Sequence, residues 1–257
     1  MNIVIIGTGN VATVLGREFK AAGHTILQIA GRNSAAASAL AYELDTVSTN
    51  YWSSVNKNAD IYIIAVSDNA INDIVSELKL PGKVVVHTAA SVPKEILKPV
   101  SNHYGVFYPL QSLRRETESL PDIPLFVDGS DENTRQVLEK LARSISGEKV
   151  VHAGNDERIK LHVAAVFVNN FTNYLYVLAE EYCKKEGIDF KLLLPLIEET
   201  AMRIKNNSPK SVQTGPAMRH DNETIQKHLT LLRQYPHLEK IYAFLSECIE
   251  KMKYNGE

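Results

Sequence analysis

The fold is decided by the stretch Asn2-Ile3-Val4-Ile5-Ile6-Gly7-Thr8-Gly9-Asn10-Val11-Ala12, at the start of a 257-residue chain. Its first five residues are typical of a buried strand, and a helical pattern follows the glycines. Gly7 would permit a tight turn, Gly9 would let backbone approach a phosphate, and Ala12 would let the helix pack closely on a sheet. Free N–H groups at a helix start favour anions. We therefore predict that a dinucleotide binds to Gly7, Thr8, Gly9, Asn10, Val11 and Ala12.

Strands and helices alternate from this turn to residue 153. Further strands are expected at Thr25–Ala30, Ile61–Val66, Val84–His87, Val106–Tyr108, Leu125–Val127 and Val150–His152. The accompanying helices are expected at Val11–Ala22, Ser34–Glu43, Asn69–Leu78 and Asn133–Ser146. This alternation is typical of an α/β fold with a doubly wound, mostly parallel sheet. Residues 1–153 are therefore predicted to form an NAD(P)-binding Rossmann domain.

After Gly154 the pattern contains only helices, which predicts an all-helical C-terminal domain over residues 154–257. Its first helix is expected to be long, Asp156–Glu186, with Asn155 or Asp156 as the N-cap and Gly187 at a left-handed C-terminal position. Further helices are expected at Phe190–Lys205, Glu223–Gln234 and Pro236–Lys253.

The composition argues against several classes of protein. A net charge of −2, from 28 basic and 30 acidic residues, provides no field for binding nucleic acid or an anionic membrane. No apolar run reaches the roughly 18–20 residues of a membrane span, and we expect a cytoplasmic protein. Cys183 and Cys248 lack metal-ligand spacing and are interpreted as free buried thiols. The scattered histidines likewise predict no metal site.

Arg32, Asn33 and Ser34 follow the second predicted strand, at the sheet edge where ligands bind. An NAD site usually carries an acidic residue here for the ribose 2′-hydroxyl, whereas a guanidinium suits a 2′-phosphate through charge-assisted hydrogen bonds. We therefore predict NADP (NADPH) as the cofactor. The alternative is a solvated surface arginine.

Two further strand ends are expected to border the ribose and the nicotinamide. They are Val66-Ser67-Asp68 and His87-Thr88-Ala89. Ser67 and Thr88 can hydrogen-bond, and a small residue such as Ala89 lets a flat ring lie against the backbone. Asp68 would equally well cap the helix expected at Asn69.

The long predicted helix carries His162, Asn169 and Asn173 on one face, because offsets of seven and eleven residues return to nearly the same side of an α-helix. Histidine is a natural general acid near neutral pH if a carbonyl or imine accepts hydride. We take His162 and Asn169 as candidates for catalysis or substrate orientation. Structural hydrogen bonds are the alternative for both.

Gly215-Pro216 interrupts the later helical pattern and presents Arg219 close to Asp221. Arg219 could hold a substrate carboxylate bidentately. Asp221 could orient Arg219 or cap the next helix, and an interdomain salt bridge between the two is the alternative. Tyr108 could line a cleft or be a core residue.

Three segments resemble a known family: Tyr108-Pro109-Leu110-Gln111-Ser112, Leu161–Asn170 and Thr214–Asp221. In them the chain resembles Rossmann-like proteins with a DUF2520-type C-terminal domain. These are related to pyrroline-5-carboxylate reductase, the β-hydroxyacid dehydrogenases and the F420-dependent NADP oxidoreductases. The resemblance implies a homodimer built by the helical domain, with the active site in a cleft between the domains.

One departure from these relatives concerns the mechanism. The β-hydroxyacid dehydrogenases carry a catalytic lysine on the long helix, where this chain has Ala165 and Val166. Their mechanism therefore does not transfer. Three hypotheses follow: an NADP(H)-dependent oxidoreductase acting on a small carboxylate-bearing carbonyl, imine or alcohol; a non-catalytic NADP(H)-binding sensor or partner-binding dimer; and an F420-type NADP oxidoreductase.

Overall fold

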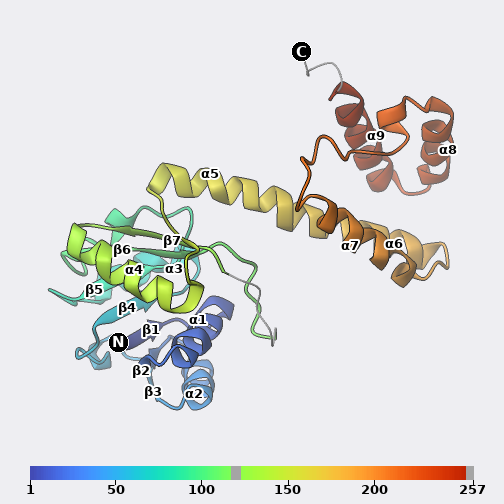
Figure 1. The fold of residues 1–257 in the computed structure, drawn as a ribbon. Helices are drawn as coiled ribbons and strands as arrows, with labels where there is room; N and C mark the ends of the chain where they lie inside the picture. Colours follow the sequence, from blue (N-terminus) through green and yellow to red (C-terminus); the bar gives the residue numbers. More distant parts are fainter. Residues whose placement is uncertain (117–122, 253–257) are drawn as a thin grey trace. The chain divides into compact units, whose positions relative to one another are not determined.

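The structure is a computed structural model that describes residues 1–116 and 123–252 (Figure 1). It divides into two compact units, residues 1–170 and residues 171 onward. The boundary between the two units follows Asn170 in the sequence, so the first part of the long predicted helix lies in the first unit. The domain boundary proposed after residue 153 stays a prediction.

One mixed sheet forms the centre of the first unit, with strand order β3-β2-β1-β4-β5-β6-β7-β8. The strands are β1 (Asn2–Ile6), β2 (Thr25–Ala30), β3 (Val47–Thr49), β4 (Ile61–Ile64), β5 (Val84–His87), β6 (His103–Pro109), β7 (Leu125–Gly129) and β8 (Val150–His152). Neighbours are parallel except β6 and β7, which are antiparallel. The predicted α/β class with a mostly parallel sheet is confirmed.

The order in which successive strands are added to the sheet reverses at β1. From β1 the sheet grows through β2 to β3 on one side and through β4 to β5 on the other. In open α/β sheets a crevice forms outside the carboxyl ends of the strands at such a switch point. The fold therefore places a ligand-binding position at Gly7.

Helices cover both faces of the sheet. They are α1 (Asn10–Ala21), α2 (Ser34–Glu43), α3 (Asp68–Glu77) and α4 (Glu132–Ser146). Successive strand side chains point to opposite faces, so Ile3 and Ile5 join the core under α1, α2 and α4, while Val4 and Ile6 join the core under α3. All four side chains are fully buried. Each stabilises the fold by about 1.5–3 kcal/mol relative to exposure.

The long predicted helix has the expected extent but not a uniform type. It consists of α5 (Asn155–Ala165), a π-helical segment (Val166–Phe171) and α6 (Thr172–Lys185). The predicted N-cap was wrong, because Gly154 occupies that position without a side-chain cap. The Asn155 side chain instead donates to Glu95 and accepts from Arg158. At the other end Gly187 has φ +71°, so the predicted left-handed position is confirmed.

The second unit continues with helices, as predicted. A 3₁₀ turn (Phe190–Leu193) leads into α7 (Leu194–Arg203), followed by a short turn (Ala217–Arg219), α8 (Asn222–Leu232) and α9 (Pro236–Lys251). Lys253, the expected end of the last helix, lies outside the described residues. Cys183 is buried as expected, whereas Cys248 is exposed, so the prediction of two buried thiols was wrong for Cys248. On α9 that thiol sits on a face that the described residues leave uncovered.

Candidate functional site

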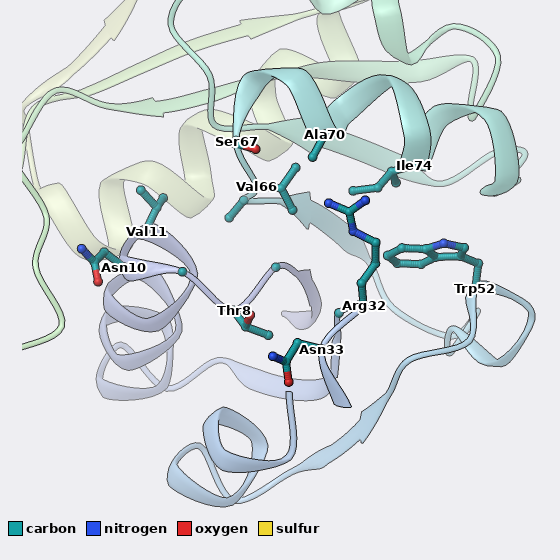
Figure 2. Close-up of a pocket in the computed structure, with 14 residues that line it drawn as sticks. Thr8, Asn10, Val11, Arg32, Asn33, Trp52, Val66, Ser67, Ala70 and Ile74 are labelled. Carbon is teal, nitrogen blue, oxygen red and sulfur yellow. The ribbon is translucent and has the colours of Figure 1, made fainter. Parts of the chain in front are cut away.

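A cavity of about 500 Å³ opens at the carboxyl ends of β1, β2 and β4 (Figure 2). Its volume suits a small-molecule or cofactor site. It is lined by Gly7, Thr8, Gly9, Asn10, Val11, Gly31, Arg32, Asn33, Trp52, Ala65, Val66, Ser67, Ala70 and Ile74. Most of the predicted dinucleotide residues are therefore brought together around one space.

The glycine turn is built as the spacing predicted. Gly7 has φ +135°, and a Cβ there would lie 2.1 Å from the carbonyl oxygen of Ala65, so only glycine fits. At Gly9, by contrast, a Cβ would meet no atom of the described residues within 4 Å. Gly9 is also the N-cap of α1 and supplies no side-chain hydrogen bond. The first N–H groups of α1 are thus left for an anion beside an open space, which fits a pyrophosphate.

The remaining residue of the motif has a packing role. Ala12 is fully buried, belongs to the core under α1 and does not line the cavity. A larger side chain there would push α1 away from the sheet. This corresponds to the third position of the motif, where a small residue allows close helix packing.

Arg32 extends over the cavity, and Figure 2 shows its side chain beside the indole of Trp52 and above Asn33. It is exposed, and its Nη1 donates to Oδ2 of Asp73 on α3 across 3.2 Å. Such an exposed ion pair contributes at most about 1 kcal/mol, so the guanidinium is available to another anion. Asn33 caps α2 by accepting from the N–H of Ala36, and Ser34 begins α2 outside the cavity lining.

Sequence reasoning missed three cavity residues and one neighbouring cation. Trp52, Ala70 and Ile74 line the cavity. Arg115, from the loop after β6, donates from Nε to Oδ1 of Asn10 across 3.1 Å and from Nη2 to the carbonyl oxygen of Thr8 across 3.5 Å. Arg115 therefore places a positive charge on the glycine turn. No motif in the sequence connects it to residues about a hundred positions earlier.

The two other predicted strand ends are placed differently. Val66 and Ser67 line the cavity, whereas His87, Thr88 and Ala89 are buried at the end of β5 outside its lining. Ser67, not Asp68, is the N-cap residue of α3. The Asp68 carboxylate accepts a hydrogen bond from the Ser91 hydroxyl.

His87 is fully buried and neutral. Its Nδ1 accepts from the N–H of Ala89 across 3.2 Å, while Nε2 has no hydrogen-bond partner among the described residues. Burial, with the positive charge of Arg158 as the second cause, lowers the pKa of His87 to about 4. Desolvation disfavours the charged form of a base, so His87 does not supply a proton near neutral pH.

Arg158, on the first turns of α5, is also fully buried. Its guanidinium donates to the carbonyl oxygens of Val92 (2.8 Å) and Ala153 (3.4 Å) and to Oδ1 of Asn155 (3.0 Å). Its Nε finds no partner in the part of the chain that the structure describes. Desolvation lowers the pKa of Arg158, yet arginine stays charged in proteins. A fixed positive charge therefore lies inside the first unit.

His162 lies one helical turn after Arg158 and contacts a strand residue. The phenol oxygen of Tyr108, on β6, is 3.2 Å from Nδ1 of His162, and the two rings meet edge to face with centroids 6.3 Å apart. Burial raises the pKa of Tyr108. The structure thus pairs two groups that can exchange a proton, and Tyr108 is more than a core residue.

Asn169 lies in the π-helical segment and is exposed. A π turn holds one residue more than an α turn, so the constant rotation assumed for the polar stripe does not hold between His162 and Asn173. Isolated π turns inside α-helices are frequent at functional sites. The role of Asn169 stays a prediction.

Arg219 and Asp221 lie in the second unit, on either side of His220, whose φ is +55°. Asp221 caps α8, accepting from the N–H (3.1 Å) and hydroxyl (2.8 Å) of Thr224. These bonds lower the pKa of Asp221. Within the described ranges no ion pair joins it to the exposed Arg219, so the guanidinium is not neutralised by its neighbour.

Metal-binding clusters and membrane-spanning helices are both absent from the described residues. Over residues 1–116 and 123–252 no group of three or more His, Cys, Asp or Glu side chains could hold a metal ion. In the same ranges no helix combines the length and apolar character required to cross a bilayer.

Two family models match the chain. The model for the NADP oxidoreductase, coenzyme F420-dependent, matches residues 2–91. The model for a domain of unknown function, DUF2520, matches residues 123–249. The predicted resemblance to Rossmann-like proteins with a DUF2520-type C-terminal domain is confirmed. No curated protein sequence matches significantly.

Solved structures are similar over the whole chain. A Bacteroides fragilis protein assigned as an NADP oxidoreductase is 36% identical, with 97% of this chain and 98% of that chain covered and a TM-score of 0.90. The imine reductase from Myxococcus stipitatus in complex with NADP⁺ is 16% identical, with 99% and 95% covered and a TM-score of 0.66. The 1-pyrroline-5-carboxylate reductase from Streptococcus pyogenes is 13% identical, with 98% of both covered and a TM-score of 0.66. The last two share the fold.

Proposed function

Because the chain belongs to the same family as the Bacteroides fragilis protein assigned as an NADP oxidoreductase, we propose that it transfers hydride between NADP(H) and a small acceptor or donor. The nicotinamide supplies the hydride chemistry, while the protein orients the reactants, excludes water and manages the proton. The acceptor is proposed to be a carbonyl or imine, or in the reverse direction an alcohol, that carries a carboxylate.

The observation that carries this proposal is the open space at Gly9 beside the uncapped start of α1. The turn excludes a side chain at Gly7 and leaves room at Gly9. This arrangement suits a pyrophosphate bound at a helix N-terminus. Thr8, Asn10 and Val11 line the same cavity. These residues are proposed to hold the diphosphate.

Arg32 supports NADP(H) rather than NAD(H). Its guanidinium is exposed at the end of β2, and Asp73 is its one ion-pair partner among the described residues. A 2′-phosphate would offer it charge-assisted hydrogen bonds that a ribose hydroxyl cannot. Binding titrations with NADPH and NADH on wild type and Arg32→Asp test this preference. We expect the variant to lose affinity for NADPH and not for NADH, and an unchanged ratio would refute the assignment.

Three residues predicted from the sequence, Arg219, His162 and Asn169, are proposed to recognise the substrate. Among the described residues Arg219 has no ion-paired carboxylate, and it could hold a substrate carboxylate bidentately. Asp221 supports it indirectly by fixing the start of α8. His162 and Asn169 are proposed to contact the reacting group.

Turnover is tested by following the loss of NADPH absorbance with a panel of 2-oxo acids, cyclic imino acids and a deazaflavin. The deazaflavin belongs in the panel because residues 2–91 match the F420-dependent oxidoreductase model. Oxidation with an oxo or imino acid supports the proposal. Oxidation only with the deazaflavin favours F420-type hydride exchange. Tight NADPH binding without oxidation by any acceptor favours a sensor.

We also propose that the second unit builds a homodimer. It exposes large apolar side chains on α6, α7, α8 and α9, including Leu196 on α7 and Phe244 on α9 at 63% and 64% exposure. A groove of about 480 Å³ between α6, α8 and α9 is mostly apolar. Contiguous exposed apolar surface marks interaction sites. Light scattering on the purified protein tests this proposal, and a monomer at micromolar concentration would refute it.

A further inference from the structure

The pair formed by Tyr108 and His162 lies at the same sheet edge as the cofactor cavity. β6 is parallel to β5, β5 to β4, and β4 to β1. Tyr108 is the second-last residue of β6, so it lies at the carboxyl edge where Gly7 follows β1. Its ring packs against Phe126 of β7 with centroids 6.3 Å apart. A half-buried phenol is thus held rigidly at the edge where the cavity opens.

Charged groups from two helices face this phenol. Arg158, from α5, lowers the pKa of Tyr108, whereas the carboxylate of Asp68, from α3, raises it, and burial raises it most. Arg158 and His162 are four residues apart on α5 and therefore share a face. The Arg158 guanidinium is fixed by three hydrogen bonds. A phenolate at Tyr108 would therefore lie near a cation that needs no rearrangement to stabilise it.

We propose that Tyr108 is the residue that donates the proton accompanying hydride transfer, that His162 restores this proton, and that Arg158 is the positioning residue that stabilises the transient phenolate. This deepens the proposed function and depends on it. Hydride moves from C4 of NADPH to the acceptor carbon, and the π electrons of C=O or C=N form the new O–H or N–H bond with the Tyr108 proton. The phenolate then takes the proton on Nδ1 of protonated His162, which reprotonates from solvent. The sum is NADPH, H⁺ and acceptor giving NADP⁺ and reduced acceptor.

A first experiment separates proton donation from hydride transfer. Wild type, Tyr108→Phe and the matched control Tyr104→Phe, on the same strand, are assayed with a cyclic imine and with its N-methyl iminium salt, which accepts hydride but needs no proton. We expect Tyr108→Phe to lose about 100-fold or more in kcat on the imine, to keep its rate on the iminium salt and to bind NADPH normally. Tyr104→Phe should behave as wild type. His162→Asn should lose less than Tyr108→Phe.

A second experiment follows the phenol without turnover. The Cζ signal of ¹³C-labelled Tyr108, assigned by its loss in Tyr108→Phe, is titrated with pH in the NADP⁺-bound protein. We expect Arg158→Gln to raise the Tyr108 pKa by about one pH unit and Asp68→Asn to lower it, since opposite charges act in opposite directions. Arg158→Lys keeps the charge and should stay near wild type. If Arg158→Gln does not fold, the Asp68→Asn and Arg158→Lys titrations still test whether these charges act on the Tyr108 phenol.

The outcomes distinguish this inference from the proposed function. If the wild-type protein oxidises NADPH with none of the acceptors tested, the proposed function and this inference are both overturned. An active wild type whose Tyr108→Phe variant reduces the imine equally well overturns this inference alone. So does a Tyr108 titration that neither Arg158→Gln nor Asp68→Asn moves.

Discussion

The guanidinium of Arg115 donates from Nε to Oδ1 of Asn10 across 3.1 Å, so a side chain from the loop after β6 lies on the first residue of α1. It also reaches the carbonyl oxygen of Thr8. Arg115 therefore adds a positive charge to the partial positive charge of the helix N-terminus, where the pyrophosphate is proposed to bind.

Arg115→Gln should weaken NADPH and NADH binding equally, because the diphosphate is common to both. We expect a loss of about five- to tenfold, or about 1–1.4 kcal/mol, since the group is exposed. Fluorescence titration at two salt concentrations measures the affinity, and the loss should shrink at high salt. Arg114→Gln is the matched control, because Arg114 pairs with Glu116 instead. An equal loss in both variants would indicate only a general charge effect.

Asp73→Asn should strengthen NADPH binding and leave NADH binding unchanged. The Asp73 carboxylate accepts a hydrogen bond from Arg32 and would repel a 2′-phosphate on the same guanidinium. The gain should be at most about fivefold, the size of an exposed ion pair. Asp45→Asn, the same charge change away from the cavity lining, serves as the control. Weaker NADPH binding would instead mean that Asp73 itself accepts a hydrogen bond from the cofactor.

The sequence predicted those elements whose structure is determined by residues only a few positions apart. The glycine turn is confirmed because its constraints lie within six residues, and Gly7 meets Ala65 at the end of an equally apolar strand. β3 was missed because Val47-Ser48-Thr49 is short and lacks an apolar run. Trp52, which follows it, was missed with it.

Other parts of the site depend on contacts between distant residues. Tyr108 and His162 are 54 positions apart, and Arg115 and Asn10 are 105 apart. No spacing rule connects such residues before the sheet order is known. The π-helical segment was likewise not predicted, since periodicity over 155–185 fits a continuous α-helix. The sequence left two roles for Asp221, which were to orient Arg219 or to cap the next helix. The hydrogen bonds from Thr224 favour the cap.

The buried His87 should make folding stability depend on pH below neutrality. Its pKa is about 4 in the folded protein and 6.5 as the ordinary value. Above pH 6.5 both states are neutral, and there is no penalty. As the pH falls from 6.5 to 4 only the unfolded state gains the proton, so the free energy of unfolding falls by about 3 kcal/mol in total.

His87→Gln should flatten this dependence. Urea unfolding at pH 4.5, 5.5 and 7 should show a smaller decline for the variant than for wild type, whatever its absolute stability at pH 7. His152→Gln is the control, since that side chain is about half exposed and pairs with Glu139. Parallel declines in wild type and His87→Gln would show that the imidazole titrates normally.

Adding a methyl group should lower the stability of the fold at Gly7 and the affinity for NADPH at Gly9. Gly7→Ala places a Cβ against the Ala65 carbonyl and forces alanine to φ +135°, so the free energy of unfolding should fall by on the order of 3 kcal/mol. Gly9 has φ −85°, which alanine adopts readily, and an added Cβ would meet no atom within 4 Å in the part of the chain that the structure describes. Gly9→Ala should therefore melt like wild type.

The same Gly9→Ala variant should nevertheless bind NADPH at least about tenfold more weakly, because the added methyl group occupies the approach to the α1 N–H groups (about 1.4 kcal/mol). Calorimetry of NADPH binding and thermal unfolding of both variants measure the two effects separately. Gly23→Ala, at another positive-φ glycine with open space around it, is the control for backbone strain alone. Normal NADPH affinity in Gly9→Ala would place the diphosphate away from the glycine turn, and the proton-donor role proposed for Tyr108 would then lose its support from the shared sheet edge.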